Sequence, residues 1–126
     1  MLKPLILKKT QLTPLVILDK DNNMFSIEGK SIYSNGYEFY TPILVWFKEY
    51  FKNPNITTEL IIYFEYINSS SFFQISRLIE MFSENINNSK LKIIWKYDFD
   101  DEIIQENGME FKKNTNFEFE VLVVKN

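Results

Sequence analysis

The sequence predicts a single α/β (α+β) domain in which helices pack on a mostly parallel or mixed β-sheet. Three observations predict this fold class. Short runs of strand-forming residues alternate with segments of helical periodicity along the whole chain. Two of these runs, residues 60–67 and 91–97, are apolar nearly throughout, as strands covered on both faces of a sheet are. The 126 residues contain no linker, repeat or low-complexity segment, so residues 1–126 are expected to form one domain.

The first two elements are expected to form a β-hairpin. Residues 15–18 and 24–28 are short apolar runs, and the segment between them, residues 19–23, consists of Asp, Asn and Lys. Such a segment between two strand-like runs is typical of a turn.

A helix is expected within residues 36–51, where apolar side chains recur at helical spacing and form a wide stripe. Thr41 and Pro42 have the sequence of an N-cap followed by a first-turn proline, so the regular helix is expected to begin there. The segment 53–55 ends it, because Pro54 cannot continue the helical hydrogen bonding.

The second half of the chain repeats the strand–helix alternation. The apolar strand 60–67 leads into the turn 68–71, after which apolar residues at helical spacing predict a helix that ends by residues 85–89. The strand 91–97 follows, and an acidic segment then opens a third helix. A closing strand at 117–124 completes the expected order β-β-α-β-α-β-α-β.

Composition excludes several function classes. The chain has no cysteine and no histidine, so it has no disulfide, no thiolate metal site and no Ser-His-Asp or Cys-His catalytic arrangement. We therefore expect a protein that is not an enzyme and that uses no cofactor. A net charge of -3 with dispersed lysines gives no basic surface for nucleic acid.

Targeting signals are also missing from the sequence. Residues 1–9 are interrupted by Pro4 and lack the continuous apolar stretch of a signal peptide. The longest apolar runs, such as residues 42–47, are too short to insert into a membrane. These features predict a cytoplasmic protein.

Six sequence blocks, taken in order and spacing, resemble a known family. The most specific combine an aromatic-Pro-helix-Trp pattern, a Tyr-x-Asn-Ser-Ser-Ser pattern and a Trp-x-Tyr-Asp pattern. The blocks are Thr13-Pro14, Gly29-Lys30-Ser31, residues 39–46, residues 66–71, residues 95–98 and residues 106–111. Over essentially its whole length the chain resembles the SiaC-like regulatory phosphoproteins of bacteria, whose fold is like that of STAS-domain anti-anti-sigma factors.

The resemblance implies a phosphorylation switch. In such proteins a Ser/Thr kinase of the histidine-kinase-like ATPase type phosphorylates the residue after the Asn of the motif, and a PP2C-type phosphatase removes the phosphate. The unphosphorylated form binds and activates a diguanylate cyclase, which raises cyclic-di-GMP and favours biofilm growth. The matching acceptor here is Ser69, with Ser70 and Ser71 as alternative acceptors that are better placed to cap the helix.

The chain departs from the family pattern in two places. Phe72, Phe73 and Gln74 stand where the family usually has a Lys shortly after the serine run. Residues 33–35 replace a usual Pro and acidic residue before the first helix. Both departures lie beside the expected partner surface.

Physical reasoning agrees with a switch at this place. The turn from Asn68 to Ser71 connects a central strand to a helix, so its hydroxyls should lie at the carboxyl edge of the sheet. Phosphorylation adds about 1.5 to 2 negative charges there, beside carboxylates that follow the neighbouring strand. A partner that tolerates the hydroxyl would then be repelled. The expected partner-binding residues are Glu65, Asn68, Ser69, Ser70, Ser71, Tyr97, Asp98, Asp100 and Asp101.

Two other interpretations remain open at this point, and a metal site is considered but not expected. Asn-Ser-Ser-Ser before an apolar helix also fits an ordinary helix cap, so the domain could be an unmodified STAS-like scaffold or interaction module. A carboxylate-based enzyme would use Glu65 and Asp98 as acid and base. The alternating carboxylates at 98, 100 and 102 suggest a metal, but they lack an EF-hand pattern and are typical of a helix start, so no metal site is expected.

Overall fold

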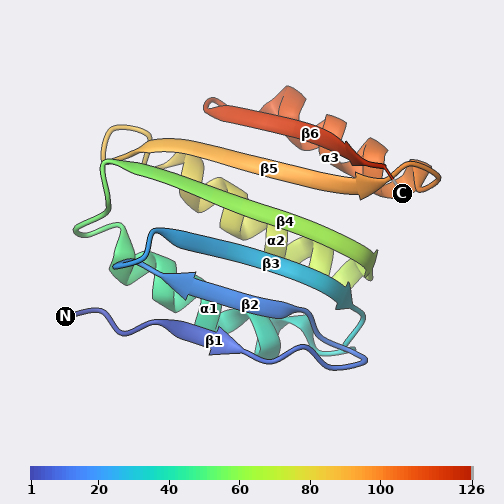
Figure 1. The fold of residues 1–126 in the computed structure, drawn as a ribbon, viewed down its shortest axis with the longest axis horizontal. Helices are drawn as coiled ribbons and strands as arrows, with labels where there is room; N and C mark the ends of the chain where they lie inside the picture. Colours follow the sequence, from blue (N-terminus) through green and yellow to red (C-terminus); the bar gives the residue numbers. More distant parts are fainter. Residues whose placement is uncertain (126) are drawn as a thin grey trace.

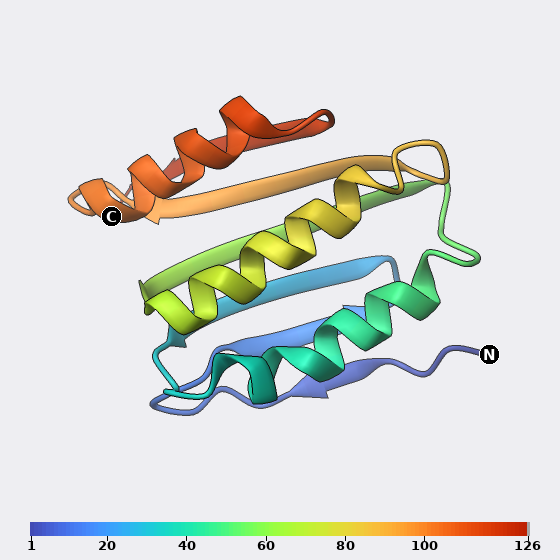
Figure 2. The same cartoon turned by 180° about the vertical axis from the view of Figure 1, so that it is seen from behind.

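The computed structural model describes residues 1–125 and has two layers, a six-stranded sheet and three helices. The helices cover one face of the sheet, as Figure 2 shows, and Figure 1 shows the other face uncovered. The elements in chain order are β1 (Leu5–Leu7), β2 (Leu15–Asp19), β3 (Met24–Ser31), α1 (Gly36–Tyr50), β4 (Thr57–Ile67), α2 (Ser69–Ser83), β5 (Lys90–Asp98), α3 (Glu102–Asn114) and β6 (Glu118–Val124).

Sheet topology confirms the predicted fold class. The strands lie in the order β1-β2-β3-β4-β5-β6. The first three strands pair antiparallel, which includes the predicted hairpin of β2 and β3, and β3 to β6 run parallel. Because parallel strands end at the same side, the carboxyl ends of β3 to β6 and the starts of α1, α2 and α3 share one side of the molecule (Figure 1), which we call the carboxyl edge.

The predicted order of elements was wrong at the N-terminus, where β1 precedes the hairpin. This strand has only three residues, and its Leu-Ile-Leu sequence is flanked by Pro4 and Lys8, so no strand-length run marks it. Its position is supported from α1, because the Trp46 indole Nε1 donates a hydrogen bond to the backbone oxygen of Lys3 at 2.8 Å.

The expectation that helices cover both faces of the central strands was also wrong. Along β4, Thr58, Leu60, Ile62 and Phe64 are buried beneath the helices, and the residues between them are half-buried or exposed. Ile61 therefore lies on the uncovered face. The continuous apolar run arises because this face carries large apolar side chains among its charged ones.

The start of α1 differs from the prediction as well. Asn35 is the N-cap, and its side chain accepts from the Glu38 N–H at 3.0 Å. Pro42 lies inside the helix, and Thr41, the expected N-cap, instead donates its hydroxyl to the Tyr37 oxygen at 2.6 Å. The extra turn places the start of α1 at the carboxyl edge.

The core lies between the sheet and the helices. As predicted, aromatic side chains fill much of it, with Trp46, Tyr50, Phe51, Phe64 and Trp95 buried and Phe111 packed against them. No helix within residues 1–125 is long and apolar enough to cross a membrane.

Candidate functional site

The predicted acceptor turn lies at the carboxyl edge, where β4 ends at Ile67 and α2 begins at Ser69. Asn68 between them is the N-cap of α2, and its Oδ1 accepts from the Ser71 N–H at 2.8 Å. The cap is therefore the asparagine, and the expectation that Ser70 or Ser71 caps the helix was wrong. The reason is that the helix starts at Ser69, which puts all three serines inside its first turn.

The three serines have different environments. Ser71 is buried, with 1% of its surface exposed. Ser70 is half-buried, and its Oγ accepts a hydrogen bond from the Gly36 N–H at 2.9 Å. Ser69 is exposed to solvent. Of these hydroxyls, Ser69 is thus the one that a visiting active site can reach without moving the backbone.

Ser69 lines a small hollow between the start of α2 and the middle of α3. The hollow has a volume of about 250 Å³ and is lined by Ile67, Asn68, Ser69, Phe72 and Asn107. Phe72 forms its apolar wall and stacks on Phe111 with ring centroids 5.1 Å apart. Asn107 comes from α3, and sequence reasoning missed it because residues 69 and 107 become neighbours only through helix packing.

The predicted carboxylates gather beside this turn. A second hollow of about 700 Å³ is lined by Lys30, Glu65, Tyr66, Asp98, Asp100, Asp101, Glu102 and Ile103. We call it the acidic hollow. It unites four of the predicted partner-binding residues, Glu65, Asp98, Asp100 and Asp101. Tyr97 on β5 was also predicted to bind a partner, but its side chain is half-buried and packs against the core.

Three of the carboxylates in the acidic hollow make contacts within the protein. Asp98 accepts a hydrogen bond from the Tyr63 hydroxyl, and this bond raises the pKa of Tyr63 to about 12. Asp101 caps α3 by accepting from the Ile104 N–H at 3.0 Å. Glu65 lies 3.8 Å from the Lys9 ammonium, an exposed pair of little energetic weight.

A metal ion has no evident place in this part of the molecule. Within residues 1–125, no group of three or more carboxylates is arranged to hold one. Asp98 and Asp101 already accept hydrogen bonds from the protein.

Large apolar side chains also lie exposed at the carboxyl edge, and two of them, Tyr66 and Ile103, line the acidic hollow. Four of them project from the ends of β4 and β5 and the first turns of α2 and α3, with 63 to 71% of their surface exposed, and we call them the apolar rim. They are Tyr66, Phe73, Phe99 and Ile103. Exposed large apolar side chains beside a polar hollow, as Tyr66 and Ile103 are, suit an interaction surface. The sequence offered one signal, because Phe72 and Phe73 are consecutive in a helix and only one of them can face the core.

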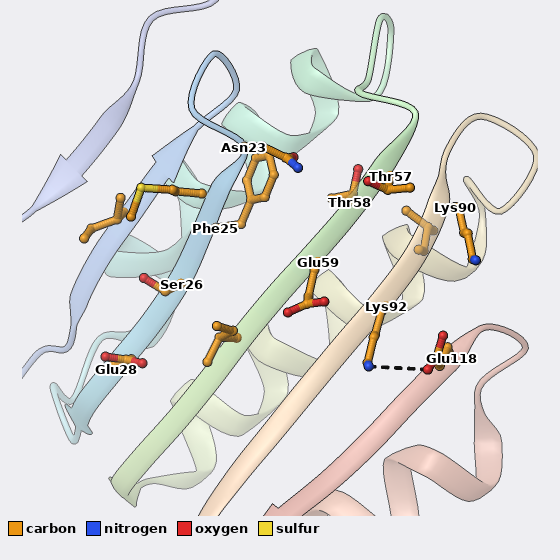
Figure 3. Close-up of a pocket in the computed structure, with 14 residues that line it drawn as sticks. Asn23, Phe25, Ser26, Glu28, Thr57, Thr58, Glu59, Lys90, Lys92 and Glu118 are labelled. Carbon is orange, nitrogen blue, oxygen red and sulfur yellow. Dashed lines mark ion pairs between the residues drawn. The ribbon is translucent and has the colours of Figure 1, made fainter.

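A further groove lies elsewhere, on the uncovered face of the sheet (Figure 3). Its volume is about 720 Å³, and it is lined by residues of β2 to β6 that include Ser26, Glu59 and Lys92. Lys92 projects toward Glu118 at 3.4 Å, the ion pair drawn in Figure 3, and also pairs with Glu120 at 3.1 Å. Neither Ser69 nor the acidic hollow contributes to this groove.

Comparison with known proteins finds one family throughout the chain. The profile of the SiaC family regulatory phosphoproteins matches residues 7–124. An uncharacterized protein of Pseudomonas aeruginosa strain UCBPP-PA14 is 25% identical over 113 residues, which cover 89% of this chain and 90% of the relative.

Solved structures of SiaC from Pseudomonas aeruginosa share the fold. One has a TM-score of 0.87 at 22% identity and covers 97% of this chain and 99% of its own. Another, of the diguanylate cyclase SiaD in complex with its activator SiaC, has a TM-score of 0.87 at 24% identity over 95% of this chain and 99% of the matched chain.

Proposed function

The chain belongs to the SiaC family of regulatory phosphoproteins and is a regulator rather than an enzyme, and we propose that Ser69 is its phosphorylation site. A Ser/Thr kinase of the histidine-kinase-like ATPase type adds the phosphate, and a PP2C-type phosphatase removes it. The single observation that carries this proposal is the exposure of Ser69 at the carboxyl edge, while Ser70 is held by Gly36 and Ser71 is buried.

The output of the switch is the second part of the proposal. SiaC of Pseudomonas aeruginosa forms a complex with the diguanylate cyclase SiaD as its activator. The unphosphorylated form of the present chain binds and activates a diguanylate cyclase in the same way, in the cytoplasm, and so raises cyclic-di-GMP. The apolar rim supports this docking, because exposed aromatic side chains supply much of the binding energy of protein interfaces.

Phosphorylation then acts by blocking the interface. A phosphate at position 69 adds about 1.5 to 2 negative charges at the first residue of α2. The start of a helix accommodates an anion, so the fold can survive the modification. A docked partner, however, must remove water from a dianion beside the carboxylates of the acidic hollow, and each 1.4 kcal/mol of this cost weakens binding about tenfold.

The proposal is tested by incubating the purified chain with Mg-ATP and each Ser/Thr kinase of the histidine-kinase-like ATPase type from its source organism. Intact mass spectrometry should show the addition of one phosphate, and peptide sequencing should place it on Ser69. Ser69→Ala should abolish the modification. The matched control Ser83→Ala removes a hydroxyl from the far end of the same helix and should leave the modification intact.

Binding measurements test the output. The unphosphorylated chain should bind the diguanylate cyclase of the same genome, and the phosphorylated chain should bind it at least about tenfold more weakly. Phe73→Ala should also weaken binding without loss of stability, since this side chain is exposed. A chain that the kinase leaves unmodified would favour an unregulated interaction module instead. Modification only at another residue would overturn Ser69 as the phosphorylation site.

A further inference from the structure

The start of α2 is tied to the segment that leads into α1. Three hydrogen bonds join them, and they involve the residues immediately before and after Ser69. They run from the Asn68 N–H to the Ser31 oxygen at 3.0 Å, from Asn68 Nδ2 to the Tyr33 oxygen at 3.1 Å, and from the Gly36 N–H to Ser70 Oγ at 2.9 Å. We call this set of bonds the clasp.

The bond between Gly36 and Ser70 requires an unusually close approach. A Cβ atom placed on Gly36 would lie 2.7 Å from Ser70 Oγ and 2.8 Å from the Ser70 carbonyl carbon. Both distances are shorter than real Cβ contacts, so only glycine lets the two helix starts touch here. The Gly36 N–H is also one of the donors at the start of α1 that the helix itself cannot satisfy. The Ser70 hydroxyl therefore accepts a hydrogen bond from a backbone N–H at the start of α1 that would otherwise have no partner within that helix.

The clasp joins two exposed segments into one surface. On one side lies the turn with Ser69 and Phe73, and on the other lies the loop with Ser34, Asn35 and Tyr37. Without the clasp, each docking partner would have to order this loop against the turn at a cost in binding free energy.

Building on the proposed acceptor role of Ser69, we propose that Ser70 is a positioning residue, whose hydroxyl holds residues 33–37 beside Ser69 so that the modifying kinase recognises both segments together. The Ser69 hydroxyl itself remains chemically unchanged when Ser70 is altered. Loss of the bond between Gly36 and Ser70, one of the three in the clasp, should therefore weaken recognition and spare the transfer step, which appears as a higher KM at nearly constant kcat.

The test measures steady-state phosphorylation of Ser70→Ala by the same histidine-kinase-like kinase, with wild type and Ser83→Ala as references. We expect KM for the protein substrate to rise about tenfold with kcat within about twofold. Hydrogen exchange of the Gly36 amide, followed by NMR, should accelerate by at least about tenfold because its acceptor is gone. If Ser70→Ala merely destabilised the protein, the apparent KM would rise only because less of the substrate is folded. Correcting the substrate concentration for the folded fraction would then restore the wild-type KM.

Gly36→Ala is the second variant. Its Cβ would force the starts of α1 and α2 apart, while no serine is substituted. It should raise KM in the same direction. If wild type is phosphorylated on Ser69 and Ser70→Ala keeps the wild-type KM, the positioning role is overturned and the proposed function stands. If wild type is not modified on Ser69, the proposed function fails and the positioning role fails with it.

Discussion

At the scale of single residues, the acceptor turn shows how four similar polar side chains acquire different roles. The Asn68 side chain makes two hydrogen bonds. Its Oδ1 accepts from the Ser71 N–H and so caps α2, and its Nδ2 donates to the Tyr33 oxygen. Ser70 bonds to Gly36, and Ser71 is buried. Their sequence predicts a turn and a helix start, but the assignment of each hydroxyl depends on contacts about 35 residues away along the chain. Short-range sequence patterns contain no record of such contacts. The cap itself is a local bond between Asn68 and Ser71, and it was predicted wrongly because α2 starts at Ser69, earlier than expected.

The pair of Tyr63 and Asp98 gives a prediction in alkaline solution. Its hydrogen bond raises the pKa of Tyr63 from 10.0 to about 12 in the folded chain. The unfolded chain therefore loses this proton at lower pH than the folded chain does, so the stabilising contribution is complete below pH 10 and is lost as the pH rises through about 12.

Tyr63→Phe should accordingly be destabilised at neutral pH and should show a shallower loss of stability between pH 10 and 12. Urea unfolding at a series of pH values measures both effects, and ultraviolet titration of tyrosinate follows the ionisation directly. Tyr37→Phe is the control, because Tyr37 is exposed on α1. Identical pH profiles for wild type and Tyr63→Phe would contradict the role of the Asp98 bond.

At the scale of elements, the long helices and strands were predicted correctly from their periodic apolar patterns. The short strand β1 and the exact ends of elements, such as β3 and α1, were not. The hairpin, all three helices and the strands β2 to β6 follow from their patterns. The strand β3 was expected to end at residue 28, yet it continues to Ser31 through an irregularity at Gly29, whose φ of 132° suits glycine. This continuation brings the Ser31 oxygen to the carboxyl edge, where it accepts from Asn68.

The packing of α3 on the sheet gives a prediction at this scale. Gly108 lies in α3 directly over Trp95, and a Cβ atom there would lie 2.3 Å from Trp95 Cδ1. The indole is fully buried and its Nε1 donates to the Ile104 oxygen at 2.9 Å, so the ring has little freedom to move.

Overpacking at Gly108→Ala should cost about 1–3 kcal/mol, and the gain in helix propensity offsets roughly 1 kcal/mol of it, so the free energy of unfolding should fall by up to about 2 kcal/mol. Chemical denaturation followed by tryptophan fluorescence measures the change. Met109→Ala alters the next, exposed position of the same helix and should change stability by no more than about 0.5 kcal/mol. Equal effects of the two substitutions would contradict the close approach of α3 to Trp95.

At the scale of the whole molecule, the two ends of the sheet differ in their side chains: one end is held by buried hydrogen bonds, and the other carries exposed polar and apolar groups. The opposite edge, where the parallel strands begin, is fixed by a buried network in which the Thr58 hydroxyl lies 2.7 Å from Tyr50 and 2.8 Å from Ser89. The carboxyl edge combines exposed Ser69, the proposed acceptor, with the acidic hollow and the apolar rim. The sequence predicted that residue 69 and the carboxylates would lie at this edge, because parallel strands end on the same side of a sheet. It did not reveal the apolar rim, since exposure of Phe99 and Ile103 depends on how the helices pack.

This division predicts how far the effect of phosphorylation extends. A phosphate on Ser69 sits at a helix start that favours anions by about 0.3–1 kcal/mol, and the neighbouring carboxylates oppose it. The free energy of unfolding should therefore change by no more than about 1 kcal/mol. In NMR spectra the amides of Ser31, Gly36 and Asn107 should shift, while those of Thr58 and Ser89 should stay unchanged. Shifts that spread to the buried network, or a large change in stability, would show that the switch works by refolding rather than by blocking the interface.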